Sequence, residues 1–152
     1  MTSTTCIVEE LMWPHVFRVA GGDNILAAGR RMREFDIGSA LVFEDAKLVG
    51  VITERDLLRA FVDCADATQA IVRDYMTPRP VTVDAAAPVG VAASLLIGLD
   101  ARHLPVTKDG VVVGVLSARD LLPLMAGDIA ARPTLEGRGR YDGPAPTLAA
   151  GA

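Results

Sequence analysis

The sequence is poor in aromatic residues, so any core must be packed from aliphatic side chains. Four Phe, two Tyr and one Trp occur among 152 residues, although 51% of the residues are hydrophobic. A chain of this length and apolar content can bury the core of a domain of ordinary size. The composition favours a folded protein built from Val, Leu, Ile, Ala and Met.

An excess of positive charge is also absent. Fifteen Lys and Arg residues stand against 19 Asp and Glu residues, which gives a formal net charge of −4. Binding to nucleic acid or to an anionic membrane calls for a basic surface. Arg30, Arg31 and Arg33 form a cluster, but Glu34 and Asp36 follow directly. We interpret the cluster as the solvated face of a helix and predict neither a nucleic-acid partner nor a membrane partner.

Cysteine and histidine are scarce, with two residues of each type. Cys6, Cys64, His15 and His103 lack metal-ligand spacing, and the two cysteines lack C-x-x-C spacing. No nucleophile has a plausible base, and no Walker-type phosphate loop is present. The sequence predicts no enzyme activity, no metal site and reduced thiols in a cytoplasmic protein.

Long hydrophobic runs are missing as well. Residues 85–99 carry no charge, but they contain two Gly and one Pro and fall short of the roughly 20 apolar residues of a membrane span. This segment predicts a buried helix. Residues 1–5 provide no basic start for a signal peptide, and we expect none.

What the sequence does contain is an internal repeat. Gly50–Asp56 (GVITERD) returns 64 positions later as Gly114–Asp120 (GVLSARD), and the halves align without a gap. Two copies of this length indicate a duplicated module. Matching pairs along the two copies include Met12/Met76, Pro14/Pro78, Val19/Val83, Ala28/Ala92, Asp36/Asp100, Val42/Val106 and Leu57/Leu121.

Each copy predicts the order strand, helix, strand, strand, helix, with a short helix before it. Apolar residues at helical spacing and β-rich runs on either side of a polar turn carry this prediction. The expected elements are 17–19, 25–32, 40–43, 48–52 and 54–62 in the first copy, 81–83, 89–97, 104–106, 111–116 and 118–125 in the second, and leading helices at 8–12 and 69–76.

Three regions follow from the repeat and from the composition. Residues 1–64 form the first motif with its leading helix, and residues 65–126 form the second. Residues 127–152 hold five Gly and three Pro with few large apolar side chains, too little to offset the cost of ordering a backbone. That segment predicts a mobile tail or an arm on a partner subunit.

The repeated pairs Thr53-x-x-Asp56 and Ser117-x-x-Asp120 allow two interpretations. As a capping box, the hydroxyl binds an orphan helix amide and the acid binds back to the cap. As a nucleotide half-site, strand ends and a helix start receive a phosphate, while the carboxylate accepts from ribose hydroxyls and apolar side chains flank a base. One motif can serve both purposes.

The pattern G-V-[I/L]-[S/T]-x-[R/D]-D after a valine-rich hairpin resembles the signature of cystathionine-β-synthase (CBS) domains, whose tandem pairs form a Bateman module. Residues 72–78 (VRDYMTP) resemble the stretch that opens a CBS motif, and residues 8–12 (VEELM) are a looser version. The resemblance covers about residues 7–126. It implies an α/β (α+β) fold in which two β-α-β-β-α motifs pack about a pseudo-twofold axis and leave two clefts.

The resemblance also implies a ligand and the residues that bind it. CBS pairs bind adenosine-containing molecules such as AMP, ADP, ATP, NAD or S-adenosylmethionine. By position, the ribose-binding aspartates correspond to Asp56 and Asp120. The hydroxyls near ribose and phosphate correspond to Thr53 and Ser117. Arg55 and Arg119 occupy a frequently basic position, where each is either a phosphate contact or a solvated helix arginine.

The two copies differ near these positions. Residues 13–15 read Trp-Pro-His, whereas residues 77–79 read Thr-Pro-Arg, so Arg79 can contact phosphate where the first copy has a histidine. Glu54 places a negative charge where the second copy has Ala118, which disfavours polyphosphates at the first motif.

Ser39 in the first copy corresponds to His103 in the second. His103 either faces a ligand cleft or is a structural histidine with satisfied hydrogen bonds. Such differences predict unequal occupancy of the two sites.

A regulatory module that performs no chemistry fits these features best. We expect a free-standing CBS pair without a required cofactor, forming a homodimer in which two pairs make a disc. An adenine nucleotide or S-adenosylmethionine would change its dimer geometry or its affinity for a separate effector protein. The alternative is a ligand-free interaction or scaffolding module.

Overall fold

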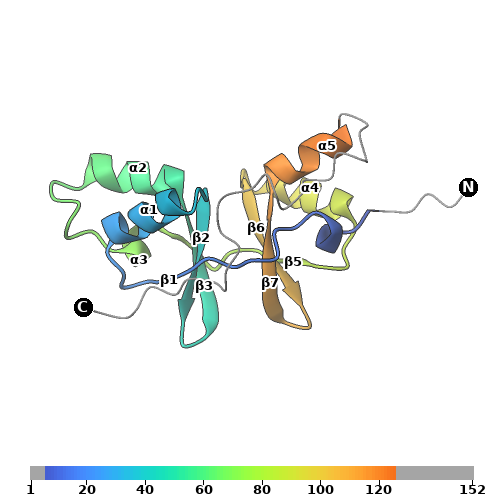
Figure 1. The fold of residues 1–152 in the computed structure, drawn as a ribbon, viewed down its shortest axis with the longest axis horizontal. Helices are drawn as coiled ribbons and strands as arrows, with labels where there is room; N and C mark the ends of the chain where they lie inside the picture. Colours follow the sequence, from blue (N-terminus) through green and yellow to red (C-terminus); the bar gives the residue numbers. More distant parts are fainter. Residues whose placement is uncertain (1–5, 126–152) are drawn as a thin grey trace, which may run out of the picture. The chain divides into compact units, whose positions relative to one another are not determined.

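The computed structural model describes residues 6–125, which form two compact units. The first-repeat unit comprises residues 17–80, and the second-repeat unit comprises residues 6–16 and 81–125. Each unit has its own sheet and its own helices (Figure 1). The tail predicted for residues 127–152 lies outside the described residues.

The first-repeat unit is built on a four-stranded sheet in the order β1-β2-β3-β4. The strand β1 is parallel to β2, and the pairs β2–β3 and β3–β4 are antiparallel. The helices α1 and α2 pack against each other (Figure 1). The bounds are β1 (Arg18–Ala20), α1 (Ile25–Glu34), β2 (Ser39–Glu44), β3 (Lys47–Thr53), α2 (Glu54–Asp63), α3 (Val72–Tyr75) and β4 (Thr77–Pro78).

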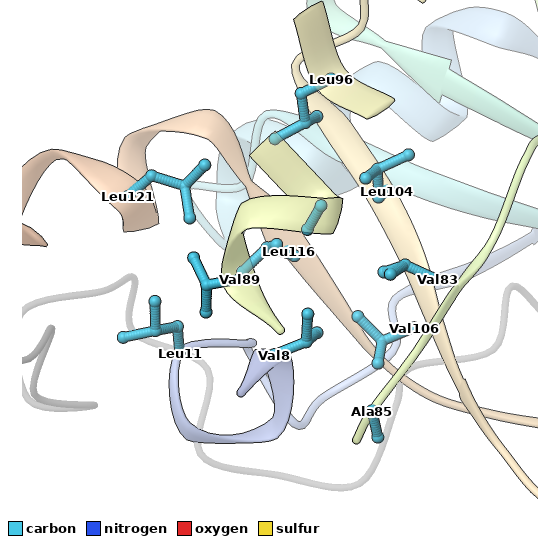
Figure 2. Close-up of a cluster of buried hydrophobic side chains, with 11 residues drawn as sticks. Val8, Leu11, Val83, Ala85, Val89, Leu96, Leu104, Val106, Leu116 and Leu121 are labelled. Atoms are coloured by element: carbon cyan, nitrogen blue, oxygen red, sulfur yellow. The ribbon is translucent and has the colours of Figure 1, made fainter. Parts of the chain in front are cut away.

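The second-repeat unit is built on a three-stranded sheet in the order β5-β6-β7, with β5 parallel to β6 and β6 antiparallel to β7. Figure 2 shows its aliphatic core, which contains no aromatic side chain. The bounds are η1 (Val8–Glu10), β5 (Val83–Asp84), α4 (Val89–Gly98), β6 (His103–Lys108), β7 (Val111–Ser117), η2 (Ala118–Leu121) and α5 (Leu122–Met125).

The 64-residue repeat extends to backbone details. Asp36 and Asp100 follow matching helices with φ of 53° and 48°, and Asp45 and Asp109 lie in matching hairpin turns with φ of 46° and 52°. Aspartate tolerates this left-handed region better than most residues. The two hairpins also share an irregularity, after Val42 in one and after Val106 in the other. The predicted duplication and the α/β fold are confirmed.

The leading segments do not pack on the motifs that follow them in the sequence. The amides of Val8 and Glu9 donate to the carbonyls of Ala87 and Ala85 at 2.9 and 2.8 Å, and Val8 is fully buried in the core of the second-repeat unit. Conversely, α3 belongs to the first-repeat unit, where the Val72 amide donates to Asp23 at 2.9 Å. The division of the sequence at 1–64 and 65–126 therefore differs from the compact units. The segment that leads the first motif packs in the second-repeat unit, and the segment that leads the second motif packs in the first-repeat unit.

The predicted helix at 118–125 is divided into the 3₁₀ helix η2 and the short helix α5. Pro123 explains the interruption. A proline ring inside a continuous helix collides with the carbonyl four residues earlier, here that of Arg119, and proline donates no amide hydrogen. The first copy has Arg59 at the matching position, and α2 runs unbroken over ten residues.

The uncharged stretch at 85–99 forms a turn and the helix α4, which buries Val89, Ala92 and Leu96. Its other face is open, because Ile97 is 81% exposed. Within residues 6–125, no helix is long and apolar enough to cross a membrane.

Candidate functional site

Each unit has one copy of the repeated motif, at the point where its last long strand meets a helix. The strand β3 ends at Thr53 and α2 follows directly, while β7 ends at Ser117 and η2 follows. Both hydroxyl residues are N-caps with extended backbone, as N-cap residues usually have. We call Thr53, Arg55 and Asp56 the first half-site, and we call Ser117, Arg119 and Asp120 the second half-site.

In the first half-site, Asp56 turns back onto the residue that caps its helix. Its Oδ2 accepts from the Thr53 amide at 2.9 Å and from the Thr53 hydroxyl at 2.8 Å. The other oxygen, Oδ1, lies 3.6 Å from the guanidinium of Arg59, and Asp56 is only 7% exposed. The carboxylate is thus held in one orientation, with Oδ1 as its less occupied acceptor.

In the second half-site, Asp120 is 1% exposed, and its Oδ2 accepts from the Ser117 amide at 2.8 Å. The Ser117 hydroxyl oxygen accepts from the Arg119 amide at 3.1 Å. The Thr53 hydroxyl instead donates to its aspartate. Both copies show the return bond from carboxylate to cap amide, which confirms the capping-box interpretation.

His103 begins the strand β6, directly opposite Ser117 in the hairpin register. Its Nδ1 is buried and has no hydrogen-bond partner among the described residues. Burial, together with the positive charges of Arg102 and Arg119, lowers the pKa of His103 to about 4, so the imidazole is neutral near pH 7. The sequence allowed His103 to be a structural histidine with satisfied hydrogen bonds. In the structure its Nδ1 has no such bond within the described part of the chain.

Arg79 lies in the first-repeat unit, although it belongs to the second copy by sequence. Its amide donates to the carbonyl of Val49 at 2.9 Å, and its backbone is left-handed with φ of 49°. Val49 precedes Thr53 by four residues on β3, which is roughly 13 Å of extended strand. The Arg79 side chain is exposed there.

Sequence reasoning missed Arg102. Its carbonyl accepts from the Ala118 amide at 2.8 Å, which ties this residue to the start of η2, and its charge acts on His103. The matching backbone bond in the first-repeat unit runs from the Glu54 amide to Gly38 at 3.2 Å. Comparing the residues just before the central strand of each copy would have shown that an arginine stands against a glycine.

Two hollows lie on the first-repeat unit. One of about 210 Å³ is bordered by Met32, Ile37, Glu54 and Leu57 and lies beside the first half-site. Small-molecule sites typically measure about 300–1,000 Å³, so this hollow admits only part of a ligand. The other, of about 360 Å³, lies between α1 and α2. Across residues 6–125, no group of three His, Cys, Asp or Glu side chains is placed to hold a metal ion.

A repeated α/β module with a capped helix at the end of each hairpin defines the class of the protein. The sequence profile described as the CBS domain matches residues 8–63 and again residues 72–127, which together make up most of the chain. The protein belongs to the CBS domain family.

Relatives include YlbB of Bacillus subtilis, which is 32% identical over 101 residues that span 65% of this chain and 68% of YlbB. MJ1225 of Methanocaldococcus jannaschii is 27% identical over 80% of this chain, but the aligned part spans only 43% of that protein. These proteins share the module at different total lengths.

Solved CBS structures superpose on the chain. ATU1752 of Agrobacterium tumefaciens gives a TM-score of 0.73 at 26% identity, covering 79% of this chain and 99% of that one. The CBS domain pair of protein MJ0100, solved with 5′-methylthioadenosine and S-adenosylmethionine, gives 0.72 at 22% identity and covers 80% of this chain and 97% of that one. At that identity the likeness to MJ0100 concerns the fold.

Proposed function

We propose that the protein is a regulatory module without catalytic activity that binds an adenosine-containing molecule through its two half-sites. One observation carries the proposal: each repeat holds a nearly buried aspartate against a strand-end hydroxyl residue, in a family whose MJ0100 member is solved with two adenosine compounds. Candidate ligands are AMP, ADP, ATP, NAD and S-adenosylmethionine.

The aspartates suit recognition of a ribose. A carboxylate has two acceptor oxygens, and in Asp56 both hydrogen bonds from Thr53 go to Oδ2. The second oxygen, Oδ1 in Asp56, is available to the hydroxyls of a sugar. At 1% exposure, Asp120 reaches a sugar only when the residues covering it move. Ligand binding at the second half-site is therefore coupled to a local rearrangement, which a sensor can transmit.

The signal needs a surface on which to act, and both units expose apolar side chains. Leu58 and Phe61 on α2 are 63% and 69% exposed, and they border the hollow between α1 and α2. In the second-repeat unit, Ile97 and Met125 are 81% and 82% exposed. Exposed apolar groups that gather on helices mark interaction surfaces. We propose that a second copy of the chain covers them in a homodimer and that the ligand alters this association or the binding of an effector protein.

A ligand-free scaffolding module is the second candidate, and one observation favours it. Both aspartates already accept a hydrogen bond from the cap residue of their helix as part of a capping box, and both are more than 90% buried. Capping of the helices alone would account for the presence of an aspartate at both positions.

Thermal unfolding with millimolar AMP, ADP, ATP, NAD and S-adenosylmethionine tests the two candidates, with GMP as the control. A ligand present at a hundred times its Kd stabilises the folded state by about 2.7 kcal/mol. For a chain of this size the melting temperature then rises by roughly 5–10 °C. A rise with an adenine ligand but not with GMP supports the sensor, whereas no rise with any ligand supports the scaffold.

A further inference from the structure

We infer that two oppositely charged residue pairs select which leading segment each unit accepts. The leading segments are residues 8–12 before the first motif and residues 69–76 before the second. The pairs are Glu9 with Lys108 in the second-repeat unit and Arg73 with Glu44 in the first-repeat unit. Positions 9 and 73 match in the 64-residue repeat, and so do positions 44 and 108. The inference goes beyond the proposed ligand binding and does not depend on it.

The backbone treats the two leading segments alike, because each forms the same two hydrogen bonds to its unit. With the donating amide first and the accepting carbonyl second, these bonds join Val8 to Ala87 at 2.9 Å, Val72 to Asp23 at 2.9 Å, Glu9 to Ala85 at 2.8 Å and Arg73 to Gly21 at 2.8 Å. Corresponding donors and acceptors lie 64 positions apart. Val8 and Val72 are both fully buried, each in the core of the unit that it joins. Backbone bonding and apolar burial therefore do not reject the alternative pairing, in which each leading segment packs on the motif that follows it.

The charged side chains do distinguish the two pairings. The Nζ of Lys108 donates to Oε1 of Glu9 at 2.8 Å, and this hydrogen bond raises the pKa of Lys108. The Nε of Arg73 donates to Oε1 of Glu44 at 3.0 Å, and its Nη2 donates to the same oxygen. In the alternative pairing Glu9 would meet Glu44, and Arg73 would meet Lys108. Two attractive contacts would become two repulsive ones.

The charges beside the two pairs favour neither pairing. Acidic residues stand next to them at matching positions in both copies, namely Glu10 and Asp74 on the leading segments and Asp45 and Asp109 in the hairpin turns. Lys47 has the uncharged counterpart Val111, but the salt bridge of Glu44 goes to Arg73. The two pairs join residues 99 and 29 positions apart, so the signal is a long-range complementarity.

An exposed ion pair stabilises a protein only weakly. Selection between two arrangements depends instead on the difference between them, and repulsion in the wrong arrangement adds to attraction in the right one. The charges therefore act mainly against the wrong pairing, while the backbone bonds and the buried valines supply the binding itself.

Thermal unfolding of the full chain tests the inference with two variants that keep the net charge of the wild type. Glu9→Arg/Arg73→Glu inverts the leading segments, and Glu44→Lys/Lys108→Glu inverts the hairpin turns. Each variant brings like charges together at both contacts, so its melting temperature should fall by roughly 2–6 °C. Hydrogen exchange at the amides of residues 8 and 72 should accelerate as the leading segments loosen. Combining all four substitutions restores opposite charges and should restore both the melting temperature and the protection.

Two controls separate selection from other effects of charge. Glu9→Gln/Arg73→Gln removes the attraction without adding repulsion, so it should lower the melting temperature less than the inverted variants do. Arg33→Glu/Asp63→Arg makes an equivalent exchange in the last turns of α1 and α2. Neither residue forms a salt bridge with another described residue, and the melting temperature should stay near that of the wild type.

Three results would overturn the inference. The inverted variants could melt with the wild type, or the combined variant could be less stable than both of them. The neutral variant Glu9→Gln/Arg73→Gln could also lose as much stability as the inverted variants, which would mean that like charges are not rejected.

Discussion

Replacing Gly114 by alanine should loosen the leading segment from the sheet of the second-repeat unit. Gly114 lies on β7, and a Cβ at this position would overlap the backbone carbonyl of Trp13. That carbonyl accepts from the Val115 amide at 3.0 Å, and the Trp13 amide donates to Val115 at 2.8 Å. A backbone carbonyl cannot swing aside as a side chain can, so both hydrogen bonds are expected to break.

Two hydrogen bonds at about 0.5–1.5 kcal/mol each amount to about 1–3 kcal/mol of unfolding free energy. The melting temperature should then fall by roughly 3–10 °C. Trp13 is the single tryptophan of the chain, so its fluorescence during urea unfolding reports directly on this contact. Its emission in the folded variant should also shift to longer wavelength, because the indole becomes more solvated.

The matched control is Gly90→Ala in α4, where an added Cβ meets no atom within 4 Å. Alanine in a helix is about 0.5–1 kcal/mol more favourable than glycine, so this variant should be as stable as the wild type or more stable. Equal stability of Gly114→Ala and the wild type, with unchanged Trp13 emission, would refute the close packing of the leading segment on β7.

Three other predictions concern stability. Leu11→Ala removes a side chain that is 4% exposed and should cost about 2–5 kcal/mol; hydrogen exchange should accelerate in residues 81–125 and not in residues 17–80, and the reverse pattern would contradict the exchanged segments. Asp120→Ala leaves the Ser117 amide without its acceptor and should cost about 1–3 kcal/mol in urea unfolding, whereas Asp120→Asn should cost less. Because the pKa of folded His103 is lowered to about 4 from 6.5, only the unfolded chain binds a proton here between these values, so stability should fall as pH drops from 6.5 towards 4; His103→Asn should make this fall shallower, and an unchanged slope would count against the buried imidazole.

The repeat made most of the fold predictable, but not the partner of each leading segment. Val8 and Val72 occupy matching positions, and both are fully buried. Either leading segment could therefore offer a suitable apolar side chain to either sheet. No local pattern in the sequence encodes which sheet each leading segment joins. The break in the last helix was predictable in principle, since Pro123 is visible in the sequence.

In the candidate site, too, some features were predictable from the sequence and others were not. The spacing of Thr53 and Asp56, and of Ser117 and Asp120, predicted the capping boxes that the structure shows. The environment of His103 was not predictable, because burial of one ring nitrogen depends on how the folded chain packs around it. Arg102 was missed for the same reason, since its proximity to the motif depends on a hydrogen bond across the fold.

The central claim is that the repeated aspartates bind the sugar of an adenosine ligand. The most direct test is calorimetric titration of AMP into the wild type and into Asp56→Asn/Asp120→Asn, with circular dichroism to establish that the variant is folded. Asparagine keeps an acceptor for the cap amide, so the fold should persist, while the affinity for AMP should drop at least about tenfold with the loss of charge-assisted bonds. Equal affinity of the two proteins for AMP would contradict the claim.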